Sequence, residues 1–158
     1  RQRAGEPGLL LAAEREVLSR LGRFKPQELG NVTWAYATLR SASPQLLGSV
    51  AAEAARRVAE LKAQELSNLL WALASCGADG AGVAGAFAAE GRGRLPDFKP
   101  QELCITAWSL AKLSVQQPEL SAAIEEAASA KLQACSPQNL SNLAWASAAL
   151  PRRNEELL

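Results

Sequence analysis

Apolar residues recur at intervals of three and four in several segments of the chain, which is the spacing that gives an α-helix one apolar face. Four of these segments align with one another without a gap, and they cover residues 24–39, 61–76, 98–113 and 135–150. Prolines near the starts of three segments suit the first turn of a helix, where a missing N–H costs little. The pattern therefore predicts four helices, which end near residues 40–43, Gly77, Ser114 and Pro151.

Second helices are predicted between these four. Residues 44–60 and 118–132 place apolar side chains at the same helical spacing, and residues 8–21 do so before the first segment. Residues 80–95 are less regular, because each of their glycines costs a helix about 1 kcal/mol relative to alanine. We still predict a helix there, since the alternation of the other segments requires an element at that place.

The four tryptophans of the chain lie at equal intervals of 37 residues, at Trp34, Trp71, Trp108 and Trp145. Insertions and deletions erase an accidental period, so equal gaps indicate tandem copies of one unit. A period of this size is typical of repeat arrays, in which each helix pair needs its neighbours to cover its apolar faces. The predicted fold is all-α, an α-solenoid of antiparallel helix pairs with a 37-residue repeat.

The repeat also divides the chain. We expect the outer helix of a preceding repeat in residues 1–23, complete repeats in 24–60, 61–97 and 98–134, and an incomplete fourth repeat in 135–158. Because the sequence starts at Arg1 without a methionine, we interpret it as a piece of a longer protein. Leucines at 9–11 and 157–158 are expected to lie at the two ends of this piece of the array, where no neighbouring repeat covers them. We therefore expect this piece alone to associate or aggregate.

The first helix of each pair is apolar on nearly all sides and keeps one narrow polar sector, which predicts the inner helix of a curved array. Stacking joins these sectors into a polar ribbon on the concave face, with lysines at its edge. Regularly spaced amides, hydroxyls and lysines suit the backbone and bases of single-stranded RNA. The candidate RNA-binding residues are Lys25, Asn31, Thr38, Lys62, Asn68, Ser75, Lys99, Lys112 and Asn142.

Each column of the ribbon also has a structural interpretation. The invariant glutamines, of which Gln27 is the first, favour helix capping or bridging between repeats. The asparagines suit a hydrogen-bond ladder between repeats, and the lysines suit solvated helix ends. The tryptophans allow a base-stacking role, but a large aromatic residue beside an invariant alanine favours a packing wedge in the core. One column differs between copies and is the best candidate for reading a sequence: Thr38, Ser75, Lys112 and Ala149.

Composition limits the range of functions. Hydrophobic residues make up 48% and charged residues 21%, which fits a folded chain, and the net charge of +1 does not itself indicate a nucleic-acid binder. Histidine is absent, which removes histidine nucleophile systems, acid–base catalysis and metal ligation. Phosphate-binding glycine motifs and clustered carboxylates are also missing. We expect no enzymatic activity, no cofactor, no metal site and no small-molecule substrate.

The three cysteines, Cys76, Cys104 and Cys135, form no CxxC pair. Each lies among apolar helical neighbours, so buried free thiols are favoured over a disulfide or a metal site. The longest apolar stretch, residues 66–78, is too short to cross a bilayer as a helix. Membrane insertion is therefore not expected.

The motif PQELxNxxWAxAxL at residues 26–39, with LSNLLWALA at residues 66–74, resembles the octotricopeptide repeat and the closely similar heptatricopeptide repeat. These helix-pair repeats occur in organellar proteins, often beside a RAP domain. The resemblance implies a soluble protein of a mitochondrion or chloroplast that binds organellar RNA, within a ribosome or another RNA–protein particle. The third repeat departs from the motif at Ile105, and no RAP domain is visible.

Two functions of different kinds remain. The first is a helical-repeat protein that holds single-stranded RNA, a transcript or ribosomal RNA, on its concave face. The alternative is a scaffold that binds other protein subunits of a large organellar complex without touching RNA. The polar ribbon and the motif favour the first, whereas the near-neutral charge and the apolar helices favour the second.

Overall fold

The structure is a computed structural model that describes residues 7–149. Within that range every regular element is a helix, which confirms the all-α prediction. Its α-helices are α1 (Pro7–Arg20), α2 (Pro26–Thr38), α3 (Pro44–Arg56), α4 (Ala63–Ser75), α5 (Ala81–Glu90), α6 (Pro100–Lys112), α7 (Pro118–Ser129) and α8 (Pro137–Ala149). Short 3-10 turns precede α2, α4, α6 and α8, at Leu21–Arg23, Val58–Glu60, Arg92–Asp97 and Leu132–Ala134.

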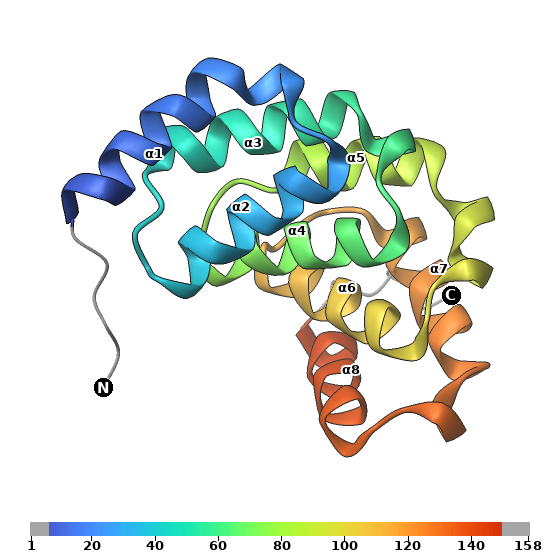
Figure 1. Ribbon diagram of the computed structural model, residues 1–158. Helices are drawn as coiled ribbons and strands as arrows, with labels where there is room; N and C mark the ends of the chain where they lie inside the picture. Colours follow the sequence, from blue (N-terminus) through green and yellow to red (C-terminus); the bar gives the residue numbers. More distant parts are fainter. Residues whose placement is uncertain (1–6, 150–158) are drawn as a thin grey trace.

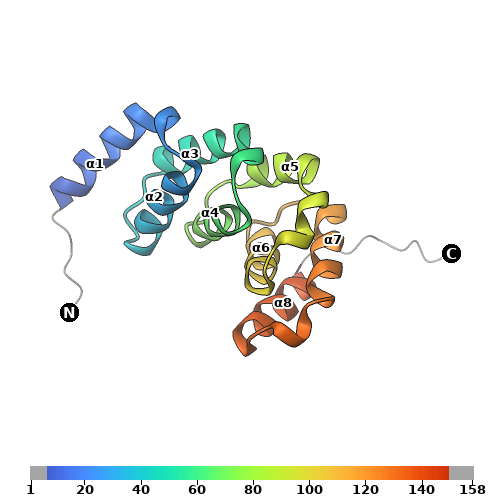
Figure 2. The ribbon, with the colours of Figure 1, turned by 45° about the vertical axis from the view of Figure 1, so that its right-hand side comes forward.

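The helices form two layers. α2, α4, α6 and α8, called here the inner helices, pack each against the next, and the outer helices α1, α3, α5 and α7 lie behind them (Figure 1). A turned view shows the stack bending into an arc with the inner helices on its inside (Figure 2). The inner helices begin at Pro26, Ala63, Pro100 and Pro137, again at intervals of 37 residues. This arrangement confirms the predicted α-solenoid of helix pairs.

A glutamate side chain caps the start of each of three inner helices. In α2 the backbone N–H of Lys25 donates to Oε2 of Glu28 at 2.7 Å, and equivalent bonds of 2.8 Å begin α4 and α6. In α8 the cap is of the reciprocal kind, because the hydroxyl of Ser136 before the helix accepts the N–H of Asn139 in its first turn at 3.2 Å. Such bonds satisfy N–H groups that have no partner within the helix. The neighbouring glutamines are therefore not the caps that the sequence suggested.

The inner helices also end alike. After α2 the N–H groups of Arg40 and Ser41 donate to carbonyls of the last turn, both at 3.1 Å, which is the bonding of a Schellman motif. That motif needs a positive φ, and φ is 52° at Arg40, 65° at Gly77 and 53° at Ser114. Glycine adopts this angle freely, whereas another residue is strained by about 1 kcal/mol or more. Three predicted helix ends are thus confirmed, and the fourth, at Pro151, lies outside the described residues.

A basic side chain in the turn after each of α3, α5 and α7 bonds the end of a repeat to the start of the inner helix of that same repeat. Nη1 of Arg57 donates to the carbonyl of Phe24 at 2.8 Å, and Nζ of Lys131 donates to the carbonyl of Phe98 at 2.6 Å. Arg94, at the matching place in the second repeat, donates to the carbonyl of Leu61 just before α4 and to that of Val58 in the preceding 3-10 turn. We call these cation–carbonyl bonds. They recur with the repeat, but periodicity alone did not reveal their partners.

The two layers enclose one apolar core. Side chains from both layers are fully buried in it, including Leu46, Val50, Leu66, Leu70, Phe87, Leu103 and Ile124. The helix predicted at residues 80–95 is present but shorter, because α5 stops at Glu90 and a 3-10 turn follows. Phe87 stacks on Phe98 with ring centroids 5.7 Å apart, and a side chain at Gly91 would collide with Phe87.

Candidate nucleic-acid interface

The concave surface consists of one stripe of residues along each inner helix. In α2 the stripe holds Gln27, Asn31, Trp34 and Thr38, and steps of four, three and four residues keep them on one face. Trp34 is 50% exposed there, Trp145 is 45% exposed, and the tryptophans of α4 and α6 are partly exposed. The interpretation of the tryptophans as a packing wedge in the core is therefore wrong.

The helical wheel explains this correction. Each residue advances by about 100°, so Trp34, seven residues after Gln27, lies only about 20° from it. Ala37 is turned by about a further 60° toward the core, where only 7% of it is exposed. The alanine beside each tryptophan occupies the interior position, and the indole projects from the polar stripe.

A groove of about 490 Å³ crosses the four inner helices. Tryptophans of α2, α4 and α6 line it, and side-chain amides of α4, α6 and α8 complete it; its lining residues are Trp34, Asn68, Trp71, Gln101, Ile105, Trp108, Gln138 and Asn142. Nε2 of Gln138 donates to Oδ1 of Asn142 at 3.1 Å. We call this feature the tryptophan groove. It combines flat apolar rings with amide donors and acceptors on one open surface.

The tryptophans differ in their ring contacts. Trp108 and Trp145 pack together, with ring centroids 6.2 Å apart and planes tilted by 42°. Within residues 7–149, Trp34 and Trp71 contact no other aromatic ring. No other aromatic ring of the described residues therefore covers the indoles of the first two inner helices, whereas each of the last two is partly covered by the other.

The predicted lysines stand at one edge of the stripe. Lys25, Lys62 and Lys99 are exposed residues directly before α2, α4 and α6. Lys62 and Lys99 line one shared hollow, and Lys99 also lines a second hollow with Asn68 and Gln101. The structure therefore brings these two lysines to the end of the tryptophan groove where the inner helices begin.

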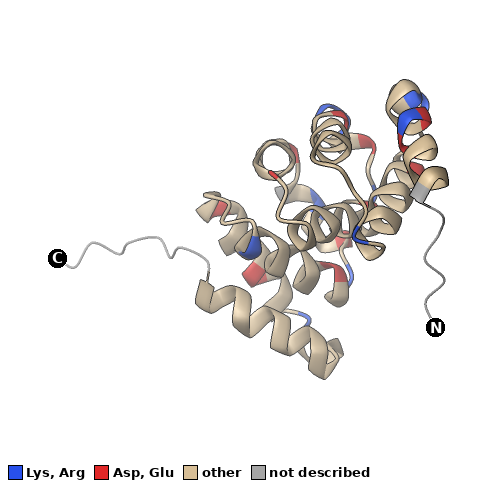
Figure 3. Ribbon diagram, turned by 90° about the vertical axis from the view of Figure 1, so that its left-hand side faces the viewer, with Lys and Arg blue, Asp and Glu red and all other residues tan. Residues whose placement is uncertain are grey.

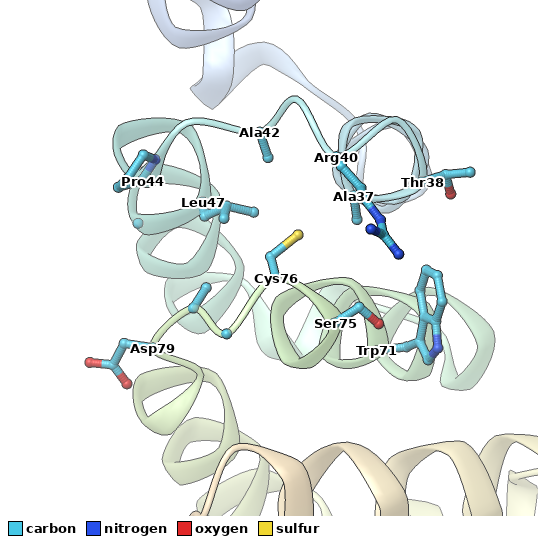
Figure 4. A pocket seen from close by; sticks show the side chains of 13 residues that line it. Ala37, Thr38, Arg40, Ala42, Pro44, Leu47, Trp71, Ser75, Cys76 and Asp79 are labelled. Carbon is cyan, nitrogen blue, oxygen red and sulfur yellow. The ribbon is translucent and has the colours of Figure 1, made fainter. Parts of the chain in front are cut away.

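The residues that differ between repeats, among them Thr38 and Ser75, lie at the opposite edge of the stripe beside a larger pocket. Thr38 and Ser75 line a pocket of about 1000 Å³ between the first and second repeats, together with Trp71 and Arg40 (Figure 4). We call it the Arg40 pocket. Lys112, at the matching place in α6, is exposed.

The remaining candidates are more scattered. Lys25, Asn31 and Lys112 are exposed on the same surface but line none of the hollows described above. Asn68 and Asn142 share the tryptophan groove, yet within residues 7–149 no hydrogen bond joins the asparagines of different helices. The asparagine column is therefore open to a ligand rather than used as an inter-repeat ladder.

Comparison with protein families adds the decisive observation. The model of the RNA-editing substrate-binding complex 6 protein family matches residues 1–158. The chain belongs to this family. No curated protein matches it significantly. The family match supports an RNA-associated helical protein, as the sequence suggested, but names a different family from the octotricopeptide repeat.

Charge on this family member follows the layers of the fold. α1 and α3 carry both acidic and basic residues, α5 and α7 carry only acidic ones, and α8 carries no charge (Figure 3). On α3 the side chains pair with one another, with Arg56 bound to Glu53 at 2.7 Å and Arg57 bound to Glu60 at 2.8 Å. The charges of α1 and α3 are therefore balanced, whereas α5 and α7 are acidic. Among residues 7–149, no helix is long and apolar enough to cross a membrane.

The cysteines are free thiols, but two of them are neighbours in space. Sγ of buried Cys104 lies 4.0 Å from Sγ of Cys135, although 31 residues separate them. Burial, with a smaller contribution from Cys135, raises the pKa of Cys104 to about 12. A thiol held in this way stays protonated at neutral pH and is a poor nucleophile and metal ligand.

Sequence reasoning missed two parts of this surface. The tryptophans could have been placed on it by the four-and-three spacing that links Gln27, Asn31 and Trp34. Arg40 could not, because an exposed arginine after a helix is ordinary in a sequence. Its position beside Trp71 depends on how α2 packs against α4.

Proposed function

We propose that this family member binds single-stranded RNA across its inner helices and acts as an RNA-holding subunit of an RNA-editing complex. The observation that carries the proposal is the exposure of the tryptophans on the concave surface, three of them in a groove with four side-chain amides. It is a binding function without catalysis. We further propose an organellar location, in a mitochondrion or chloroplast, as the octotricopeptide-like motif implies.

Unpaired bases suit this groove better than a duplex does. Stacking of a base on an aromatic side chain contributes about 1–3 kcal/mol, and it requires a base whose face is accessible. Side-chain amides offer donors and acceptors to the edges of such bases. With a net charge of +1, stacking rather than counterion release supplies most of the affinity, so we expect a shallow dependence on salt.

Protein partners are proposed for the two ends of the arc. Leu9 and Leu11 of α1 are 69% and 59% exposed, and Leu140 of α8 is 43% exposed. Leucines that match Leu140 in α2, α4 and α6 are buried by the next inner helix, which α8 lacks within the described residues. These leucines offer apolar surface to a further helix pair or to another subunit of the complex. The scaffold function therefore accompanies RNA binding and uses a different surface.

The test is a titration of labelled single-stranded RNA with this chain at several salt concentrations. We expect Trp34→Ala to weaken binding about tenfold, because one stacking contact is removed from a half-exposed site. Arg56→Ala is the matched control, since its side chain is 67% exposed on the convex side. Absence of RNA binding by the unaltered chain at low salt contradicts the proposal and leaves the scaffold function alone.

A further inference from the structure

The Arg40 pocket is built where the ends of two inner helices meet. It is lined by the last turn of α2, the segment that leads into α3, and the end of α4 with the turn that follows. Figure 4 shows the Arg40 side chain extending from the end of α2 toward Ser75 and Trp71 of α4. Most of the remaining lining is apolar, including Ala42 and Leu47.

Arg40 is an unusual residue for its backbone conformation. Its φ of 52° lies in the left-handed region, where the second repeat has Gly77. Within residues 7–149, the guanidinium of Arg40 forms no hydrogen bond or ion pair. The helix cap accounts for the positive φ of the Arg40 backbone, which a glycine would serve as well. The guanidinium has no partner in the described part of the fold and is available to a ligand.

The pocket depends on a small residue at position 76. At the matching place in the next repeat, Leu113 covers Gly80 so closely that a Cβ on Gly80 would lie 2.5 Å from Cδ1 of Leu113. Cys76 is shorter, and its thiol points into the open space (Figure 4). The sequence of the second repeat thus leaves a space that the third repeat fills with leucine.

Arg40 dominates the charge of the pocket. Asp79 also belongs to the lining, but Figure 4 shows its carboxylate turned away from the centre. Oδ1 of Asp79 accepts the N–H of Ala81 at 2.9 Å, at the start of α5. The side chains that face the space are therefore one free cation, one indole, two hydroxyls, one thiol and an apolar floor.

We propose that the Arg40 pocket takes one unpaired RNA base, held between the guanidinium of Arg40 and the indole of Trp71. The inference rests on the proposed function and assigns a base subsite to it. A base fits better than a phosphate, because the apolar lining favours a flat heterocycle and a guanidinium stacks on its face. The hydroxyls of Thr38 and Ser75 are placed to meet the base edge, which gives the variable column its role.

Two variants test the pocket from opposite directions. Arg40→Gly removes the guanidinium, and Cys76→Leu fills the space while it leaves the charge unchanged. We expect each to weaken binding of single-stranded RNA about fivefold or more, as loss of one stacked base requires. The unfolding midpoint of Arg40→Gly should not fall, because glycine relieves the positive φ.

Ser114→Gly is the matched control. It relieves the same backbone strain in the third repeat, where φ is 53°, and removes no guanidinium, so RNA affinity should not change. Loss of affinity in Arg40→Gly but not in Cys76→Leu means that Arg40 is only a surface charge, and it overturns the pocket proposal. Unchanged affinity in both variants also overturns it, while loss in Trp34→Ala keeps the proposed function.

A protein occupant gives a third result. If both pocket variants bind RNA normally but no longer retain a subunit of the editing complex in a reconstituted assembly, the pocket holds a protein side chain and the base proposal is wrong. If the unaltered chain binds no RNA, the proposed function fails and the base subsite fails with it.

Discussion

The junction between the first and second repeats and the junction between the third and fourth repeats, called here the first and last junctions, are built from the same motif. They nevertheless expose different surfaces. Between the first and second repeats, Trp71 contacts no other ring within residues 7–149 and lines the Arg40 pocket. Between the third and fourth repeats, Trp108 and Trp145 pack together at 6.2 Å. A tryptophan at a fixed place in a repeat is therefore not a fixed site. Its availability depends on what the neighbouring repeat places beside it.

The difference has identifiable causes at single positions. At the first junction Cys76 leaves a pocket open, whereas Leu113 fills the matching space between the second and third repeats. Thr38 and Ser75 add hydroxyls to the wall of the open pocket. At the last junction the matching pair is Lys112 and Ala149, and the indoles cover each other. We infer that RNA bases are held more tightly at the first junction than at the last.

The largest expected effect concerns the cation–carbonyl bonds, which occur in the first repeat and in the third. Arg57→Ala removes the bond to Phe24 and two ion pairs within the first repeat, and Lys131→Ala removes the bond to Phe98 within the third repeat and the bond to Pro96 just before it. We expect each to lower the free energy of unfolding by about 2 kcal/mol, because charge-assisted hydrogen bonds are lost. Chemical denaturation measures this. A much smaller loss in one variant shows that the first and third repeats also differ in how their two helices are held together.

The next effect separates the tryptophans. Trp71→Leu should weaken RNA binding about tenfold, because it removes a free ring that lines both the groove and the Arg40 pocket. Trp145→Leu should change affinity about threefold at most, since its ring already packs on Trp108. Leucine keeps apolar volume, and circular dichroism checks that each variant stays helical. Equal losses of RNA affinity in the two variants would show that the two junctions hold RNA equally well, which contradicts the difference inferred between them.

The smallest effect is a dependence on pH at the last junction. The pKa of the buried Cys104 thiol is raised from 9.0 to about 12, so the folded chain keeps a proton that the unfolded chain loses above about pH 9. Stability should therefore fall as pH rises through this range. Cys104→Ser should flatten the fall, and serine occupies the matching positions Ser67 and Ser141.

A control at the first junction sharpens this result. Burial also raises the pKa of Cys76, but Cys76 is less buried than Cys104 and has no thiol neighbour within the described residues. Cys76→Ser should flatten the alkaline loss of stability less than Cys104→Ser does. Thermal unfolding across alkaline pH measures both. An equal or larger effect of Cys76→Ser would show that the thiol pair does not control this dependence.

Much of the fold could be predicted because the signals are local. Helix starts follow from Pro26, Pro100 and Pro137, and Gly77 marks the end of α4 by its preference for a positive φ. The polar stripe was also predictable, since helical spacing alone places Asn68 and Ser75 on one face. The tryptophans were wrongly assigned to the core because their size was given more weight than their position on the helical wheel.

The sequence by itself determined the repeat, the boundaries of the first three inner helices and the stripe that faces inward, because helix ends and helix faces depend on residues within one or two turns. Only the tertiary structure decided that Arg40 extends toward Trp71, that Trp108 covers Trp145, and that Cys104 lies beside Cys135. These relations depend on the curvature of the stack and on the size of side chains that a different repeat contributes. Repeats with the same motif therefore form sites that differ in shape and in accessibility.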